Sequence, residues 1–441
     1  MKIDQRYKDL FFTLINQLWR LVSAPITLML IPLFLPPDVQ GYWYLFGSIA
    51  AFGALADMGF TTIILQFTAH EFAFLSFNKN NILDGDETHL KRLGSFFKFS
   101  VKWFFTLGLT AFFVMYIAGF AFFLRDGVFS KYWFPWTIYA FAAMLLLVLN
   151  AVFSFIEGLN KIETAQKMRI IVSVVNTIIL AGILAGGGQI YALSLGMLTS
   201  VLAGIILIFA KFSANIKQLI NASEGFKYNW KKDVLPLLTK YAVSNVCVYF
   251  MFTIYTPVTH YFYGPVFSGK TGISITLVLS LVNFSGIWIY TVIPKINMLV
   301  SKRLWNQLDM LFRKRFLCVM AAYICGVLGL FGFLLIFRNW RMISQITSRF
   351  LPLKMIIMLF TGYFIQSALN CVGVYLRGHK QDPLVLPAAA AAVWTAALTV
   401  ISGKFLPPEW IFTGFLSSYV FLLPVNAVIF VKCRKNWHSA L

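Results

Sequence analysis

Three charged residues lie inside long apolar stretches of the sequence. Arg20, Asp57 and Lys240 each fall several residues within a run that is otherwise hydrophobic. A charged side chain at the centre of a bilayer costs about 2.5–3.5 kcal/mol on insertion scales, so such residues normally face a cavity or a partner. Two bases and one acid at such positions have the chemistry to bind an anion, to form an ion pair or to exchange a cation.

Two interpretations of these charges remain open on the sequence. At 1.5 Å per residue, Arg20 and Asp57 reach similar depths on neighbouring helices, so an ion pair between them could join those helices. Alternatively, Arg20 and Lys240 face a shared cavity as a cationic substrate-binding site, and Asp57 serves as a gating or ion-coupling group.

Neutral polar residues recur in the same apolar stretches. Hydrogen bonding between helices is the ordinary role of any one of them. Their number is better explained by a water-filled cavity, so we predict a polar cavity lining that consists of Asn16, Gln17, Asn150, Asn245, Asn283, Gln366 and Asn370.

Motifs for catalysis, metal binding and nucleotide binding give no support to an enzyme. Gly264, Gly269, Lys270 and Thr271 match the phosphate-loop spacing, but we expect them in a short external loop, without the strand, helix and soluble domain that this motif requires. No HExxH or GxSxG motif and no paired carboxylates at a common depth in the apolar runs occur, and the five cysteines form no CxxC pattern. We therefore expect no catalytic residue, no metal and no cofactor.

The composition indicates which elements must hold these residues. The 441 residues are 59% hydrophobic and only 12% charged, whereas about 25% of residues are charged in soluble domains. Lipid offers no partner for open backbone groups, so the apolar runs are expected to be helices. Runs long enough to cross about 30 Å of hydrocarbon are found near 13–35, 42–66, 101–124, 134–156, 170–186, 189–210, 235–257, 273–294, 316–337, 354–376, 384–402 and 409–431.

Basic residues predict the orientation of this all-α, polytopic membrane protein of about twelve transmembrane helices. Most of the 37 Lys and Arg fall on segments that are inside if the N- and C-termini are both cytoplasmic. The net charge of +21 comes from many short segments and not from one basic face. An anionic membrane leaflet and an anionic substrate explain this charge better than a nucleic-acid partner.

A faint internal repeat favours two six-helix halves. We predict an N-terminal lobe at 1–210, a basic cytoplasmic linker at 211–234 and a C-terminal lobe at 235–441. An offset of 220 residues relates Arg20 to Lys240 and Asn150 to Asn370, although chance matches in a biased composition are an alternative explanation. Glu157 and Arg377 lie at cytoplasmic helix ends, where either a salt bridge between the halves or ordinary solvation is expected.

Three short segments give the chain a resemblance to a known family. These are Gly41–Tyr42 at the start of the second apolar run, Asp57-Met58-Gly59-Phe60 within it, and Glu157–Lys161 at the end of the fourth. With them the sequence resembles the polysaccharide transporter family, which contains the O-antigen and exopolysaccharide flippases of the multidrug, oligosaccharidyl-lipid and polysaccharide exporter (MOP) superfamily. Lys240 falls where related flippases tend to carry a basic residue, although Lys is less suited than Arg to bidentate phosphate binding.

The resemblance implies a flippase of the bacterial cytoplasmic (inner) membrane that works by alternating access. Its cargo would be an undecaprenyl-pyrophosphate-linked oligosaccharide, the repeat unit of an O-antigen or exopolysaccharide, moved from the inner to the outer leaflet. Membrane lipid, a proton or sodium counter-ion and a polysaccharide polymerase are the partners that this implies.

Two other functions compete with this one. A multidrug or cation antiporter of the same superfamily would favour acidic residues in the cavity. The predicted buried charges, however, are two basic residues and only one acidic residue, Asp57. A membrane glycosyltransferase or polymerase would place catalytic carboxylates or arginines in a large outer loop, and the longest predicted outer loop holds no Asp or Glu.

Overall fold

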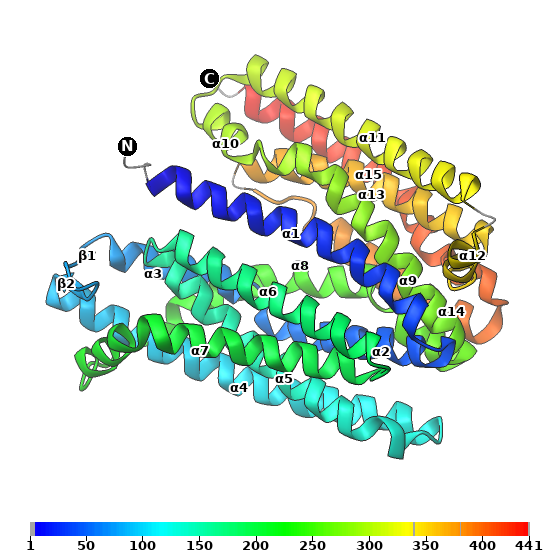
Figure 1. Cartoon of the computed structure of the whole chain (residues 1–441). Coiled ribbons are helices and arrows are strands. Elements are labelled where there is room, and N and C mark those ends of the chain that lie inside the picture. Colours follow the sequence, from blue (N-terminus) through cyan, green and yellow to red (C-terminus); the bar gives the residue numbers. More distant parts are fainter. Residues whose placement is uncertain (1–4, 338–339, 380, 440–441) are drawn as a thin grey trace. The chain divides into compact units, whose positions relative to one another are not determined.

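The computed structural model describes residues 5–337, 340–379 and 381–439, and the side chains of a few residues within helices, including Arg20 and Lys240, lie outside this description. Nearly all of the described chain is helical (Figure 1). In chain order, the elements are α1 (Gln5–Phe34), α2 (Pro37–Ala54), η1 (Leu55–Asp57), α3 (Phe60–Phe72), β1 (Leu75–Phe77), β2 (Leu83–Gly85), α4 (Glu87–Arg125), α5 (Phe129–Gly158), α6 (Ile162–Ala185), α7 (Tyr191–Ala222), α8 (Trp230–Phe252), α9 (Tyr255–Tyr290), α10 (Ile293–Ser301), α11 (Trp305–Ile336), α12 (Arg341–Thr347), α13 (Leu353–Gly378), α14 (Val385–Phe405), η2 (Pro408–Trp410) and α15 (Thr413–Ser439).

Eleven helical stretches of the described residues are long and apolar enough to cross a membrane. One of them, Asn245–Ser301, has 57 residues, and it covers the end of the predicted seventh span and all of the eighth. The chain is therefore an all-α, polytopic membrane protein, as predicted. We call the helix ends that the sequence assigns to the cytoplasm the inner ends, and the opposite ones the outer ends.

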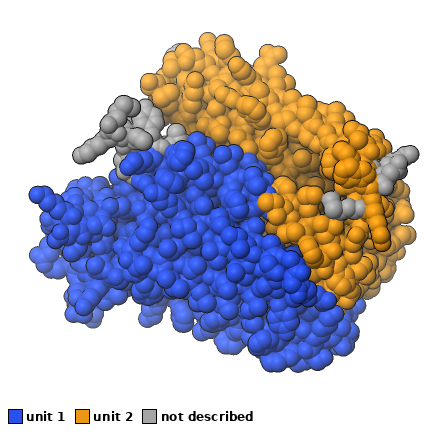
Figure 2. Space-filling model, in the orientation of Figure 1, with its two compact units in different colours: residues 1–23, 46–246 blue, residues 24–45, 247–441 orange. Residues whose placement is uncertain are grey.

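The chain forms two compact units (Figure 2). Unit 1 comprises Met1–Ser23 and Phe46–Val246, and unit 2 comprises Ala24–Leu45 and Cys247–Leu441. The boundaries therefore fall within helices α1, α2 and α8. Residues 211–222 continue α7, and residues 230–234 begin α8, so the connection without regular structure is 223–229. The predicted division at 211–234 stays a prediction.

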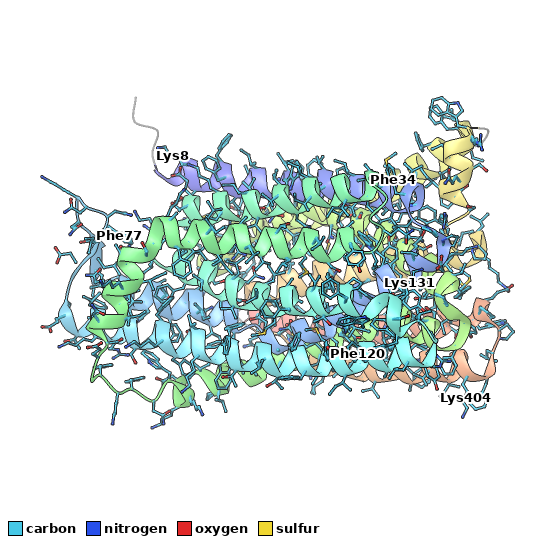
Figure 3. The ribbon with its side chains drawn as sticks, turned by 60° about the horizontal axis from the view of Figure 1, so that its bottom comes forward. Lys8, Phe34, Phe77, Phe120, Lys131 and Lys404 are labelled. Atoms are coloured by element: carbon cyan, nitrogen blue, oxygen red, sulfur yellow. The ribbon has the colours of Figure 1, made fainter. Side chains whose placement is uncertain are left out.

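Unit 1 is a bundle in which α4, α5, α6 and α7 lie side by side (Figure 1). Lys8 and Phe77 lie at one end of this unit and Lys131 at the other (Figure 3), which matches the alternation of predicted inner and outer segments. Its core includes Phe60 and Phe96 together with Trp230, the first residue of α8. The start of α8 is thus packed into unit 1.

Unit 2 repeats the packing order of unit 1. In unit 1, α4 packs against α5 and α6 against α7; in unit 2, α11 packs against α13 and α14 against α15. The same order of partners supports the duplication that the 220-residue offset suggested. A cluster around Tyr255, Tyr363 and Phe412 forms much of the core of this unit.

The phosphate-loop spacing falls in a helix and not in the external loop that we expected. Helix α9 runs from Tyr255 to Tyr290 and is broken only at Gly264, whose φ is 82°. The residues that follow are helical and pack against the start of α2, where the Gln40 side-chain amide donates a hydrogen bond to the Gly269 carbonyl oxygen at 3.0 Å. Their glycines therefore serve close helix packing, and no phosphate-binding loop is formed.

Candidate functional site

The two basic residues predicted to bind substrate cannot be placed at side-chain level. Arg20 lies in α1 and Lys240 in α8, and both side chains are outside the described residues. Their role as a cationic site, and the alternative ion pair between Arg20 and Asp57, stay predictions.

Asp57 lies at a break in the second membrane-spanning stretch. Helix α2 ends, η1 closes at Asp57, and α3 begins at Phe60 after Met58 (φ 46°) and Gly59 (φ 78°) turn the backbone into the left-handed region. The two carboxylate oxygens accept hydrogen bonds from the backbone N–H and the hydroxyl of Thr61, both at 3.0 Å. The side chain thus satisfies a free amide of the first turn of α3.

A chain of hydrogen bonds joins three helices of unit 1. The Asn16 side-chain amide donates to Gln166 Oε1 (2.7 Å), and the Gln166 amide donates to Glu157 Oε1 (3.1 Å). Arg169 donates through Nε to the same Glu157 oxygen and through Nη1 to Asn150 Oδ1, each at 3.1 Å. We call these five residues the α1–α5–α6 network. Two of them, Asn16 and Asn150, belong to the predicted cavity lining.

Helix geometry explains why these side chains meet. On α6, Gln166, Arg169 and Ser173 recur at intervals of three and four residues and so share one face. This face receives Asn16 and, one turn further along α1, Trp19, whose indole N–H donates to the Ser173 hydroxyl at 3.0 Å. Near the inner end, the carboxylate of Asp9 accepts a hydrogen bond from the backbone N–H of Glu163 at 3.0 Å and so caps α6.

The ion pair within the α1–α5–α6 network is only partly covered. The side chains of Arg169 and Glu157 retain 21% and 16% of their exposure, and the guanidinium lies 5.0 Å from the centre of the Phe153 ring. Both hydrogen bonds to Glu157 converge on Oε1, and neither Glu157 Oε2 nor Arg169 Nη2 has a partner among the described residues. A partly accessible cation, with donors that no other described residue uses, is therefore present in a membrane-spanning helix.

Unit 2 holds a smaller polar chain at the corresponding place. The Tyr419 hydroxyl donates to Gln366 Oε1, and the Gln366 amide donates to Asn370 Oδ1, each at 3.0 Å. Asn370 is the residue that the 220-residue offset pairs with Asn150. In each unit, the matched asparagine thus accepts a hydrogen bond inside a membrane-spanning stretch.

The remaining predicted lining residues do not join either chain. Gln17 and Asn283 are exposed and Asn245 is half-buried, and within the described part of the protein none of the three has a hydrogen-bond partner. Their assignment to a cavity stays a prediction.

Sequence reasoning missed Arg169 and Gln166 because it placed the start of the fifth span at residue 170. Helix α6 begins at Ile162, so Arg169 lies about two turns inside it. The polar stripe at helical spacing was the available signal. Glu157 pairs with Arg169 at 3.1 Å within unit 1 and is therefore not simply solvated. Arg377 lies 3.7 Å from Asp382 within unit 2 and keeps 55% of its side-chain exposure, which agrees with the expected solvation.

A second group of titratable side chains gathers at the inner end of unit 2. Asp309 accepts hydrogen bonds from the Tyr375 hydroxyl (2.8 Å) and from Arg434. The His379 ring bonds to the Tyr375 carbonyl oxygen at 3.1 Å, and His438 lies 3.9 Å from the Asp309 carboxylate. These contacts tie α15 to α11 and α13.

Comparison with known proteins shows which solved structures share the fold of this chain. No protein-family model matches the chain, and no curated protein sequence matches it. The chain is similar to the inward-facing structure of a multidrug resistance MATE family transporter of the MOP superfamily, with a TM-score of 0.64, 12% identity and 96% of each chain covered. An outward-facing structure of such a transporter gives a TM-score of 0.55 at 12% identity, covering 98% of this chain and 94% of that one.

A MATE structure in complex with MaD3S gives a TM-score of 0.56 at 13% identity, covering 99% of this chain and 97% of the other. At these identities the likeness establishes the fold. The chain has the fold of the MATE transporters of the MOP superfamily over nearly its whole length.

Proposed function

We propose that the chain is a flippase that moves an undecaprenyl-pyrophosphate-linked oligosaccharide from the inner to the outer leaflet of the bacterial cytoplasmic membrane by alternating access. The MATE-like fold supports transport, since the similar structures include inward-facing and outward-facing transporters. The observation that carries the choice of cargo is the presence of basic residues in membrane-spanning helices: Arg169 in α6, Arg20 in α1 and Lys240 in α8.

The physics of the cargo agrees with these charges. A pyrophosphate and its sugars lose their hydration in hydrocarbon, and arginine or lysine donors along a path replace part of it. With the cell interior negative, outward movement of an anionic group is favoured by about 2.3 kcal/mol per charge per 100 mV. A proton or sodium ion is the counter-ion that we propose, and a polysaccharide polymerase is the partner that would use the product.

The test replaces Arg20 and Lys240 singly with alanine in cells that depend on the protein. We expect surface polysaccharide to fall and lipid-linked oligosaccharide to accumulate on the inner leaflet, because each variant loses a charge that the anionic cargo needs. Lys131→Ala, which removes a basic residue at an outer helix end, is the control and should export normally. Normal export by both Arg20→Ala and Lys240→Ala at normal protein levels would contradict the cationic site.

A multidrug or cation antiporter is the second candidate. It is favoured by Asp57 inside a membrane-spanning stretch, by Glu157 at the inner end of α5, and by the multidrug resistance named for the similar MATE transporter. The same cells distinguish the two functions: expulsion of ethidium with unchanged polysaccharide export would select the antiporter.

A further inference from the structure

We propose that Arg169 binds a phosphate group of the cargo and that Glu157 is the internal anion that occupies Arg169 when no cargo is bound. The proposal rests on the flippase function and names a binding residue in unit 1 in addition to the predicted Arg20 and Lys240. The chemical class of ligand is a phosphate monoester or pyrophosphate with an attached lipid.

The first support is the unused hydrogen-bonding capacity of the pair. A guanidinium offers five N–H donors in a planar fork, and the contacts of Arg169 use Nε and Nη1 alone among the described residues. Glu157 likewise accepts through one oxygen. The remaining Arg169 and Glu157 atoms are not among the buried unpaired polar atoms of the described residues, so they are open at the surface and available to a ligand.

The second support is access. Both side chains are largely but not completely covered, so a ligand can reach the guanidinium without unfolding the helices. Phosphate oxygens match the guanidinium fork as well as a carboxylate does and carry more charge. A phosphate can therefore compete with Glu157 for the same donors.

The third support is the way in which the α1–α5–α6 network holds the two groups. Asn150 accepts a hydrogen bond from Nη1 of the guanidinium and Glu157 accepts one from Nε, while Gln166, itself held by Asn16, donates to the carboxylate. When Glu157 yields Arg169 to a phosphate, its hydrogen bond from Gln166 remains. The carboxylate thus keeps one partner in either state, which lowers the cost of the exchange.

The neighbouring ion pair on α6 shows what an ordinary pair looks like in the same helix. Lys167 binds Glu163 one turn before it and packs its ammonium 4.3 Å from the centre of the Phe12 ring. It shares none of the hydrogen bonds of the α1–α5–α6 network. Lys167 is therefore a matched control for the loss of one positive charge from this helix.

The test measures binding of farnesyl pyrophosphate to the purified full-length protein in detergent by isothermal titration calorimetry, with inorganic pyrophosphate and farnesol as separate probes. For Arg169→Gln we expect affinity for farnesyl pyrophosphate to fall roughly tenfold or more, since a charge-assisted hydrogen bond is lost. For Glu157→Gln we expect affinity to rise about threefold to tenfold, because the competing charge is gone. Lys167→Gln should bind like the wild type.

The double variant Glu157→Gln/Arg169→Gln should show no gain over Arg169→Gln, because the carboxylate acts through the guanidinium. A gain in affinity cannot result from damaged folding, so Glu157→Gln remains decisive if Arg169→Gln is unstable. Unchanged or weaker binding by Glu157→Gln overturns this inference and leaves the flippase proposal standing. Failure of the wild type to bind farnesyl pyrophosphate overturns both this inference and the flippase proposal. If inorganic pyrophosphate binds as tightly as farnesyl pyrophosphate, the ligand of Arg169 is not lipid-linked.

Discussion

The carboxylate of Asp57 accounts for a break in a membrane-spanning helix. Its two oxygens hold the backbone and the hydroxyl of Thr61, while Gly59 supplies the left-handed turn between η1 and α3. Backbone amides released by a break in lipid need a partner, and here the acid provides one. Asp57 thus has a structural role that is independent of any gating role.

Substitution of Asp57 separates the two roles. We expect Asp57→Ala to lower the stability by about 1 kcal/mol, because the first turn of α3 loses its acceptor. Asp57→Asn keeps an acceptor oxygen and should lose less. Thermal unfolding in detergent measures the difference, and equal stability of Asp57→Ala and the wild type would contradict the capping role. Loss of export by a stable Asp57→Asn would support the gating prediction.

His379 makes the inner end of unit 2 sensitive to pH. Burial lowers the pKa of His379 below its ordinary value of 6.5, and the nearby His438 lowers it further, against opposing effects of the Tyr375 carbonyl and Asp309. The ring stacks on Trp437 at 4.4 Å. A histidine with a lowered folded-state pKa stabilises the fold above its unfolded-state pKa, and this stabilisation is lost as the pH falls below that value.

Thermal unfolding at several pH values checks this prediction. Between about pH 7.5 and 5.5, the melting temperature of the wild type should fall more steeply than that of His379→Phe, which keeps an aromatic ring and removes the titrating group. His438, Asp309 and Arg434 are the same in both proteins. Parallel pH profiles would contradict the assignment.

At the scale of elements, the helices follow from composition, but their interruptions do not. The run at 42–66 predicted a single span, whereas the structure has α2, η1 and α3 because Asp57, Met58 and Gly59 together form a capped turn. The break at Gly264 was likewise taken for a loop. Hydrophobicity decides what lies in lipid, whereas such breaks depend on a few backbone angles and local hydrogen bonds.

The candidate site, like the helices, could be predicted only in part from the sequence. Polar residues within apolar runs pointed to Asn16, Asn150, Gln366 and Asn370, and the structure joins these in two polar chains. Arg169 escaped prediction because a charged residue near a span end is ordinarily solvated. Its place depends on how far α6 extends toward the inner end, and apolar runs define helix ends poorly.

The close packing of helices α2 and α9 is a second feature at the scale of elements. A Cβ on Gly41 would overlap the carbonyl oxygen of Pro265, so the outer end of α2 can approach α9 only with glycine there. This explains the glycine that opens the second apolar run.

Two glycines of α2 provide a matched comparison. We expect Gly41→Ala to destabilise the protein by about 1–3 kcal/mol, because α2 or α9 must shift. Gly47→Ala should leave the stability unchanged or slightly raised, since nothing lies within 4 Å of the added methyl group. Melting temperatures in detergent measure both effects, and equal tolerance at the two positions would contradict the close approach.

At the scale of the whole molecule, the fold and the charge carry the functional argument together. The helical fold matches MATE transporters over nearly the entire chain, and the basic residues in membrane-spanning helices are the reason why we propose an anionic cargo. The order of helix packing in unit 2 repeats that of unit 1, which is a common way to build a transporter. The anionic, lipid-linked cargo is our proposal, and a cation antiporter is the other candidate on the same fold.

Reconstitution tests this account most directly. Purified protein in liposomes that contain undecaprenyl-pyrophosphate-linked oligosaccharide should move the sugar to the opposite leaflet, and a membrane-impermeant lectin should detect this faster than in protein-free liposomes. The double variant Arg20→Ala/Lys240→Ala, at equal protein density, should lose most of the acceleration. Transfer by the wild-type protein at the protein-free rate would contradict the proposed function.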